Sequence, residues 1–163
     1  MMKKHFIYLL LTALTLVVGG CSSSDDNDEQ RPEEPQTPAY LTPGTDQRPV
    51  DWTFSDDGRF ELRMSVQVEL GDTLAAYQSS QDLMCATIDG EVRAVTPPCV
   101  TSGIVYYPLI IFDHAMGKTV SLRYYCDKLH RIYTISNWAT FNPSAAPTGT
   151  VGFYRPRFTA EKQ

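Results

Sequence analysis

The sequence lacks most residue patterns that mark a catalytic protein. No Cys-x-x-Cys pair is present, which argues against a structural zinc site or a thioredoxin-type redox site. No Gly-x-Ser-x-Gly elbow is present, so the common hydrolase nucleophile turn is missing. Only two histidines, His114 and His130, follow the N-terminal apolar block. The chain also shows no internal repeat, and nothing in it points to a cofactor.

A long hydrophobic run is missing as well. The apolar block from Phe6 to Val18 is shorter than the roughly 20 residues that a membrane-spanning helix needs. Two lysines precede this block and two glycines follow it, as in a cleaved secretion signal. We therefore interpret residues 1–20 as a signal peptide, and Cys21 comes directly after it.

The stretch Val18-Gly19-Gly20-Cys21 resembles the lipobox of bacterial lipoproteins. This resemblance implies that Cys21 is acylated and holds the protein in a membrane, since each buried CH₂ group contributes about 0.8 kcal/mol. The serines and acids behind Cys21 resemble the surface-export signal of Bacteroidota lipoproteins, which implies an outer-membrane protein facing the cell exterior. The alternatives are a soluble secreted protein with an incidental cysteine, and a solvated tether without a sorting role.

Basic residues are few, and the net charge of −5 is unevenly distributed. Residues 22–50 carry seven acids, two bases and five prolines. Such a composition predicts a disordered, extended tether over residues 21–50. Residues 51–163 are close to neutral and have no basic stripe, so we expect no nucleic-acid partner.

The alternation of apolar and polar residues over 51–163 predicts one all-β domain. Residues 60–70 alternate without a break, as in a half-buried strand. Residues 82–95 indicate a hairpin, because Asp89-Gly90 suits a two-residue type I′ turn. That turn would place Ile88 opposite Glu91, Ala86 opposite Arg93 and Cys85 opposite Ala94.

Further strands are expected at 104–112, 119–126, 131–135 and 150–158. Residues 104–112 are apolar on both faces, which predicts a buried central strand, although Pro108 fits such a strand poorly. Pro156 places the last strand at a sheet edge. Residues 72–81 suit either a short helix or an irregular strand. The expected architecture is a single antiparallel β-sandwich or a partly open barrel.

Three cysteines follow Cys21, namely Cys85, Cys99 and Cys126. An odd number leaves at least one thiol outside any intrachain bridge. We expect at most one disulfide, and Cys85–Cys99 would close the shortest loop.

The order of the elements resembles a β-sandwich domain that recurs in Bacteroidota surface and secreted proteins. The likeness covers residues 52–141 and rests on the stretches FELRMSV, DTLAAY, GEVRAV and YYPLIIF, followed by SLRYYC. Where many members have Cys-Arg-Gly, this chain has Val92-Arg93-Ala94. The resemblance implies no catalytic residue.

The polar residues of these motifs favour structural roles. Asp72 and Arg93 could pair with each other across the sheet. His114 and His130 lie in expected turns, and Cys126-Asp127-x-x-His130 has metal-capable groups without a second cluster. We therefore predict no metal site and no catalytic residue, with most acids on the solvent faces of strands.

Aromatic residues are the remaining indication of a binding surface, and we expect alternate tyrosines of the strands to face outward. The residues concerned are Trp52, Trp138, Tyr106, Tyr107, Tyr124, Tyr125, Tyr133 and Tyr154. Such rings can stack on sugars or anchor a protein partner, or they can simply cover the edge of the core. The favoured hypothesis is a non-enzymatic accessory lipoprotein in an outer-membrane assembly such as a SusC/SusD-like nutrient importer. The alternative is a glycan-binding module, and a fimbrial subunit or a hydrolase is less favoured.

Overall fold

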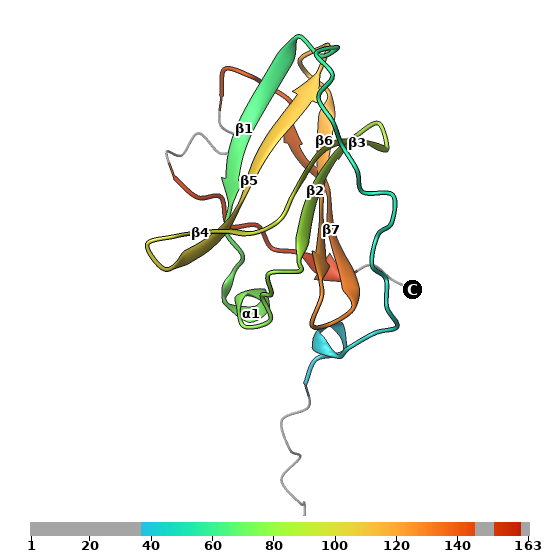
Figure 1. Ribbon diagram of the computed structural model, residues 1–163, viewed down its shortest axis with the longest axis vertical. Coiled ribbons are helices and arrows are strands. Elements are labelled where there is room, and N and C mark those ends of the chain that lie inside the picture. Colours follow the sequence, from blue (N-terminus) through green and yellow to red (C-terminus); the bar gives the residue numbers. More distant parts are fainter. Residues whose placement is uncertain (1–36, 146–151, 161–163) are drawn as a thin grey trace, which may run out of the picture. The chain divides into compact units, whose positions relative to one another are not determined.

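The protein is an antiparallel β-sandwich, seen in a computed structural model that describes residues 37–145 and 152–160 (Figure 1). One sheet has the strand order β1-β5-β4 and the other has the order β3-β2-β6-β7-β8, and they do not close into a barrel. The strands are β1 (Leu62–Val68), β2 (Leu83–Ile88), β3 (Glu91–Thr96), β4 (Cys99–Thr101), β5 (Ile104–Asp113), β6 (Thr119–Cys126), β7 (Arg131–Thr140) and β8 (Thr159–Ala160). The short helices are η1 (Ala39–Leu41) and α1 (Asp72–Ala75). This architecture confirms the predicted all-β class.

The core lies between the two sheets and follows the alternation in the sequence. In β1, Met64, Val66 and Val68 are buried while the residues between them are exposed. In β6, Val120, Leu122, Tyr124 and Cys126 are buried against them. The period-two pattern therefore places one face of each strand in the core.

The β2–β3 hairpin has the expected turn and a different register. Asp89 and Gly90 have φ angles of 54° and 80°, and Ile88 lies opposite Glu91, as predicted. Beyond that point a bulge shifts the pairing, so that Ala86 lies opposite Ala94 and Cys85 opposite Val95. The predicted partners of Ala86 and Cys85 are therefore wrong. Arg93 is the extra residue, and a bulge residue of this kind has no cross-strand partner.

Strand β5 is central, as expected, but it is not buried on both faces. Tyr107, Leu109, Ile111 and Asp113 face the core, whereas the residues between them are exposed or half-buried. The prediction of burial on both faces is wrong because no further layer of described residues covers the outer face of this three-stranded sheet. Pro108 lies beyond the end of β4, where β5 needs no second ladder partner.

The two other uncertain segments have different outcomes. Residues 72–81 contain the four-residue helix α1 followed by turns, which agrees with the short-helix alternative. The predicted strand over 150–158 is not formed in its described part. There, Tyr154 makes one parallel bridge to Val68, and regular pairing resumes only at Thr159. Pro156 lacks an N–H group and interrupts a ladder between these points.

Residues 37–52 form a strap whose start, with Leu41, packs at the edge of the main core and whose later part packs on the outer face of the five-stranded sheet. In Figure 1 the strap rises from η1 along this sheet towards the start of β1. The Tyr133 hydroxyl donates to the carbonyl of Tyr40 at 2.6 Å, and Trp52 is 5% exposed. The packed unit thus begins earlier than the predicted boundary at residue 51, and the disorder expected for 37–50 is not found. All acids of that segment except Asp46 precede residue 36, so its composition is uneven.

The three cysteines of the described residues are free thiols, so the expected Cys85–Cys99 bridge is not formed. Cys85 belongs to β2 of one sheet and Cys99 to β4 of the other. Cys85 and Cys126 are buried, and Cys99 is half-buried. The predicted signal peptide and the acylation of Cys21 lie outside the described residues.

Candidate functional site

The outer face of β5 carries a continuous apolar stripe. Every second residue of the strand points to this face, and Ile110 is 48% and Ile104 37% exposed. We call these residues the β5 stripe: Ile104, Tyr106, Pro108, Ile110 and Phe112. The antiparallel register places polar residues of β1 beside it, with Ser65 opposite Ile110 and Gln67 opposite Pro108. An apolar strip with a polar rim is typical of a protein interaction surface.

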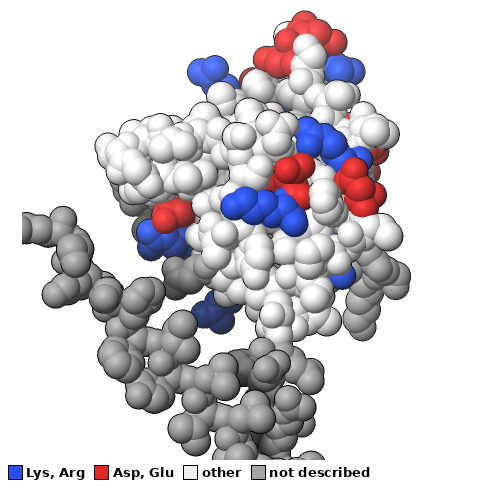
Figure 2. Space-filling view, turned by 60° about the horizontal axis from the view of Figure 1, so that its bottom comes forward, with Lys and Arg blue, Asp and Glu red and all other residues white. Residues whose placement is uncertain are grey.

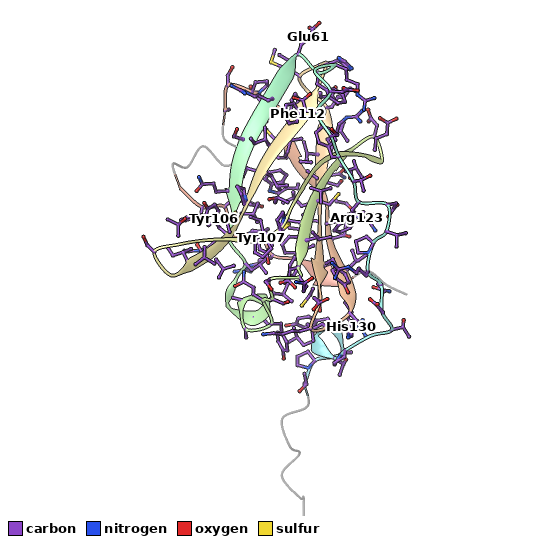
Figure 3. The ribbon with its side chains drawn as sticks, viewed as in Figure 1. Glu61, Tyr106, Tyr107, Phe112, Arg123 and His130 are labelled. Atoms are coloured by element: carbon purple, nitrogen blue, oxygen red, sulfur yellow. The ribbon has the colours of Figure 1, made fainter. Side chains whose placement is uncertain are left out.

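An aromatic group extends the stripe at the end of β5 that carries the Phe112 label in Figure 3. The ring of Phe54 lies 5.5 Å from that of Phe112, and the ring of Phe60 lies 4.9 Å from that of His114. The Arg93 guanidinium lies 5.1 Å from the centroid of Phe60. These rings are half-buried apart from the exposed His114, so they form a ready anchor point on an open surface.

A trough of about 270 Å³ runs beside the stripe, at the seam between the two sheets. Its walls come from the segment that follows the strap, from β3 and from β5. The lining includes Phe54, Asp56, Val95, Pro108, Ile110 and Phe112. Most of the residues that line the trough are apolar, but polar and apolar atoms contribute about equally to its exposed surface.

A second hollow of about 540 Å³ lies where η1, α1 and the C-terminal segment meet. Tyr40, Thr73, Leu74, Arg155, Arg157 and Phe158 line it. The Arg155 guanidinium is engaged by Glu69, with both N···O distances near 3 Å. Arg157 is exposed and has no ion pair with a described side chain. The hollow therefore combines two rings, two hydroxyl groups and one available guanidinium.

Figure 2 brings the end of the domain with η1 and α1 forward. Its basic and acidic side chains lie in small mixed groups among uncharged ones. On this face no area of one sign is large enough to attract a polyanion or polycation by charge alone.

Asp82 is a buried carboxylate with four hydrogen-bond donors. The hydroxyls of Tyr107 and Tyr124 donate to its Oδ2 at 3.2 and 2.7 Å. The N–H of Ser79 donates to Oδ2 and that of Asp127 to Oδ1, both at 2.9 Å. Burial, followed by the nearby charged acid, raises the pKa of Tyr107 far above its ordinary value. The tyrosines therefore remain neutral donors.

Asp113, at the end of β5, is the second buried carboxylate, and it forms ion pairs with two basic side chains. The Nζ atom of Lys118 lies 3.1 Å from its Oδ1, and the Nε atom of Arg93 lies 3.5 Å from its Oδ2. The N–H groups of His114 and Ala115 also donate to Oδ1. Burial acts to raise the pKa of Asp113, but these donors and the lysine charge outweigh it, and the pKa lies below its ordinary value.

The candidate residues that were named from the sequence do not come together in one site. Arg93 pairs with Glu91 at 2.7 Å and with Asp113, so the structural role predicted for it is confirmed, while the side chain of Asp72 is outside the described part. His114 and His130 lie in turns, as predicted. Most acids were expected on solvent faces, and Asp82 and Asp113 are buried exceptions. Within the described residues, no group of three His, Cys, Asp or Glu side chains could hold a metal ion.

The eight aromatic residues do not form an exposed row. The faces alternate as expected, with Tyr106 outward beside the inward Tyr107 and Tyr125 outward beside the inward Tyr124, but Tyr107, Tyr124, Tyr125 and Tyr133 are all buried. Their hydroxyl groups find acceptors within the domain, and the strap covers Tyr125 on the outer face. Trp52 is buried too, and Trp138, Tyr106 and Tyr154 are half-buried. The stacking surface expected for sugar rings is therefore missing from the sheets.

Sequence reasoning missed the phenylalanine group and both buried carboxylates. The signal for the β5 stripe was present, because a strand with apolar residues on both faces can leave one face uncovered in a two-layer fold. In comparisons with known proteins, no protein-family model, no curated protein and no solved structure matches the chain. Residues 37–145 and 152–160 contain no helix with the length and apolarity needed to cross a bilayer.

Proposed function

We propose that the protein is a non-enzymatic surface lipoprotein that acts as an accessory component of an outer-membrane assembly. A SusC/SusD-like nutrient importer is one such assembly. The acylated Cys21 would hold the chain in the membrane, and the β5 stripe would make the protein contact. The observation that carries the proposal is the difference between the two outer faces: the strap covers the five-stranded sheet, whereas the stripe on the three-stranded sheet is open.

The positions of the two buried carboxylates, Asp82 and Asp113, support a binding role over an enzymatic one. The oxygens of Asp82 and Asp113 are engaged by donors from the fold, and neither residue lines the trough or the larger hollow. An active site would instead gather acidic or basic groups in a cleft that a substrate can enter. The exposed Ile110 beside the rings of Phe54 and Phe112 suits an apolar side chain of a partner.

The test is crosslinking in native membranes with an affinity-tagged full chain carrying Ile110→Asp. A carboxylate placed in the middle of the stripe should abolish a stoichiometric complex with an envelope protein, which mass spectrometry identifies. Met116→Asp is the matched control, because Met116 is exposed in the turn after β5 and lies outside the stripe. The proposal fails if the same partner is retained by Ile110→Asp, or if wild type yields no stoichiometric partner.

Glycan binding at the hollow near α1 is the second candidate, and the available guanidinium of Arg157 favours it. Tyr40 and Phe158 could pack on a sugar ring while Arg157 pairs with a carboxylate on that sugar. Isothermal titration with polygalacturonate, with neutral dextran as the comparison, tests this candidate. Arg157→Gln should weaken polygalacturonate binding at least about tenfold, and an equal affinity of mutant and wild type would rule out the hollow as the site.

A further inference from the structure

The strap has three parts: a start at which Leu41 packs against the main core and Tyr40 accepts from the Tyr133 hydroxyl, a polar middle part, and an apolar lock. In the polar part, Arg131 Nε donates to the carbonyl of Thr42 at 2.6 Å, and the Gly44 N–H donates to the carbonyl of Leu129 at 2.8 Å. Further along, the Ile132 N–H donates to Gln47 Oε1 at 3.1 Å. These are isolated links between single groups, and no described pairing makes the strap a strand of the sheet.

Two charged side chains add to the polar part. Arg48 pairs with Asp127 at 3.3 Å and lies 5.7 Å from the ring centroid of Tyr125, while Asp46 accepts from the Tyr125 hydroxyl at 3.0 Å. Both side chains of the Arg48–Asp127 pair are substantially exposed to water. Exposed ion pairs of this kind stabilise a structure by about 1 kcal/mol or less.

Trp52 is the lock at the far end of the strap. It packs with Cys85 and Tyr125 in a cluster that is separate from the main core, and Arg123 lies 5.1 Å from its ring centroid. Figure 3 shows Arg123 beside the strap. The residues next to this cluster, such as Leu83, Val95 and Ile132, are only half-buried even with the strap in place. Beyond the lock, residues 55–59 are exposed and lead to β1, so they can serve as a hinge.

We propose that the strap is a releasable cover, which detaches from the five-stranded sheet as one unit while the sandwich stays folded. Detachment would expose the apolar face around Cys85 and Tyr125 and give the domain a second, normally concealed surface. The physical basis is that the strap is held by isolated polar links and by only two buried side chains, Leu41 at the edge of the main core and Trp52 in the outer cluster, whereas the sandwich is held by its own larger core. Segments with few buried contacts open locally at a lower free energy than the whole fold.

The three thiols make the opening measurable. Cys85 is fully buried under the strap, Cys126 is fully buried in the main core, and Cys99 is half-buried. Burial raises the pKa of the Cys85 thiol to about 12, so the covered residue is an unreactive thiol and must be uncovered to react. Cys126 reports opening of the sandwich itself, and Cys99 reports that the reagent works.

The experiment is alkylation of the full chain carrying Cys21→Ser with iodoacetamide, followed by peptide mass spectrometry at each thiol over time. The alkylation rate of each thiol is divided by the rate of the same thiol in the urea-unfolded chain, which corrects for differences in intrinsic reactivity. In the otherwise wild-type chain, Cys85 should react at least about tenfold faster than Cys126, since strap opening is cheaper than unfolding. Equal rates for Cys85 and Cys126 would overturn the proposal, and this comparison needs no destabilised variant.

Two variants assign the opening to the strap. Trp52→Ala removes the lock and should raise the Cys85 rate at least about tenfold while the Cys126 rate stays unchanged. Arg48→Ala removes an exposed link, cannot disturb the core and should raise the Cys85 rate about two- to fivefold. If neither variant changes the Cys85 rate, opening occurs elsewhere, for example in the β2–β3 hairpin, and the strap is not a cover. A parallel rise at Cys126 would mean global unfolding and would also overturn the proposal.

Discussion

The Tyr124 hydroxyl donates a hydrogen bond of 2.7 Å to Oδ2 of Asp82, and this bond lies inside the core. Tyr107 donates to the same oxygen from the opposite sheet. One carboxylate oxygen therefore joins the two layers of the sandwich at a point where water is excluded. A buried acid of this kind is stable because each of its oxygens has donors.

Asp82→Ala should be among the most damaging single substitutions in the domain. It leaves two tyrosine hydroxyls and two backbone N–H groups without their acceptor, and each buried unsatisfied group costs about 1–3 kcal/mol. We expect the free energy of unfolding in urea to fall by at least about 3 kcal/mol. Tyr124→Phe removes one donor only and should cost about 1–2 kcal/mol. A loss below about 1 kcal/mol for Asp82→Ala would contradict this account.

Asp113 should make stability depend on pH in the acidic range. Its pKa is below the ordinary value in the folded state, so the unfolded chain binds more protons as the pH falls below about 5. The contribution of Asp113 is thus complete above the unfolded pKa of about 3.9 and is lost as the pH falls through the folded pKa.

Asp113→Asn provides the measurement for that dependence. The mutant should be less stable than wild type at pH 7, because Lys118 and Arg93 lose their buried counter-charge. Urea unfolding between pH 2.5 and pH 7 should show this difference shrinking as the pH falls below about 4. A difference that stays constant over the whole range would show that the charge of Asp113 is unimportant.

The hairpin turn gives a third prediction. Gly90 has a φ of +80°, and a Cβ atom there would meet no other atom within 4 Å. Gly90→Ala should therefore cost about 1–2 kcal/mol through backbone conformation alone. Gly71→Ala is the matched control, since Gly71 has a φ of −69° and also has room for a Cβ atom. Thermal unfolding of both variants tests the prediction, and equal midpoints would refute it.

Cys21→Ala should release the protein from membranes. The small residues before Cys21 and the short apolar block motivate this prediction, because acyl chains on the thiol would be the membrane anchor. Incorporation of labelled palmitate and membrane fractionation measure the outcome. Equal membrane association of the mutant and wild type would refute the lipoprotein interpretation.

Local patterns in the sequence were sufficient for the strands and the turn. The alternation over 60–70 gave the inward face of β1, and Asp89-Gly90 gave the hairpin. The bulge at Arg93 was not predictable, because the turn chemistry sets the pairing only next to the turn. The predicted register therefore failed at Arg93, whose side chain pairs with Asp113 of the other sheet.

The candidate surfaces were less accessible to sequence reasoning. The identity of the residues in the β5 stripe was visible, but whether a second layer covers that face depends on how the chain crosses between sheets. The burial of Tyr107 and Tyr124 depends on Asp82, which lies 25 and 42 residues away from them in the chain. The strap was missed because composition was averaged over a segment in which the acids come first and Leu41 and Trp52 come later.

The packing of the strap shortens the distance that the domain could reach from a membrane anchor at Cys21. A chain acylated at Cys21 has about 16 residues before the strap begins, and these span at most about 58 Å. A free segment up to residue 50 would have spanned about 108 Å. The volume within reach of the anchor is thereby reduced roughly sixfold, which raises the local concentration of the domain at partners embedded nearby. If Cys21 is acylated as proposed, fixing the strap to the sheet would favour encounters with neighbours in the same membrane over encounters farther out.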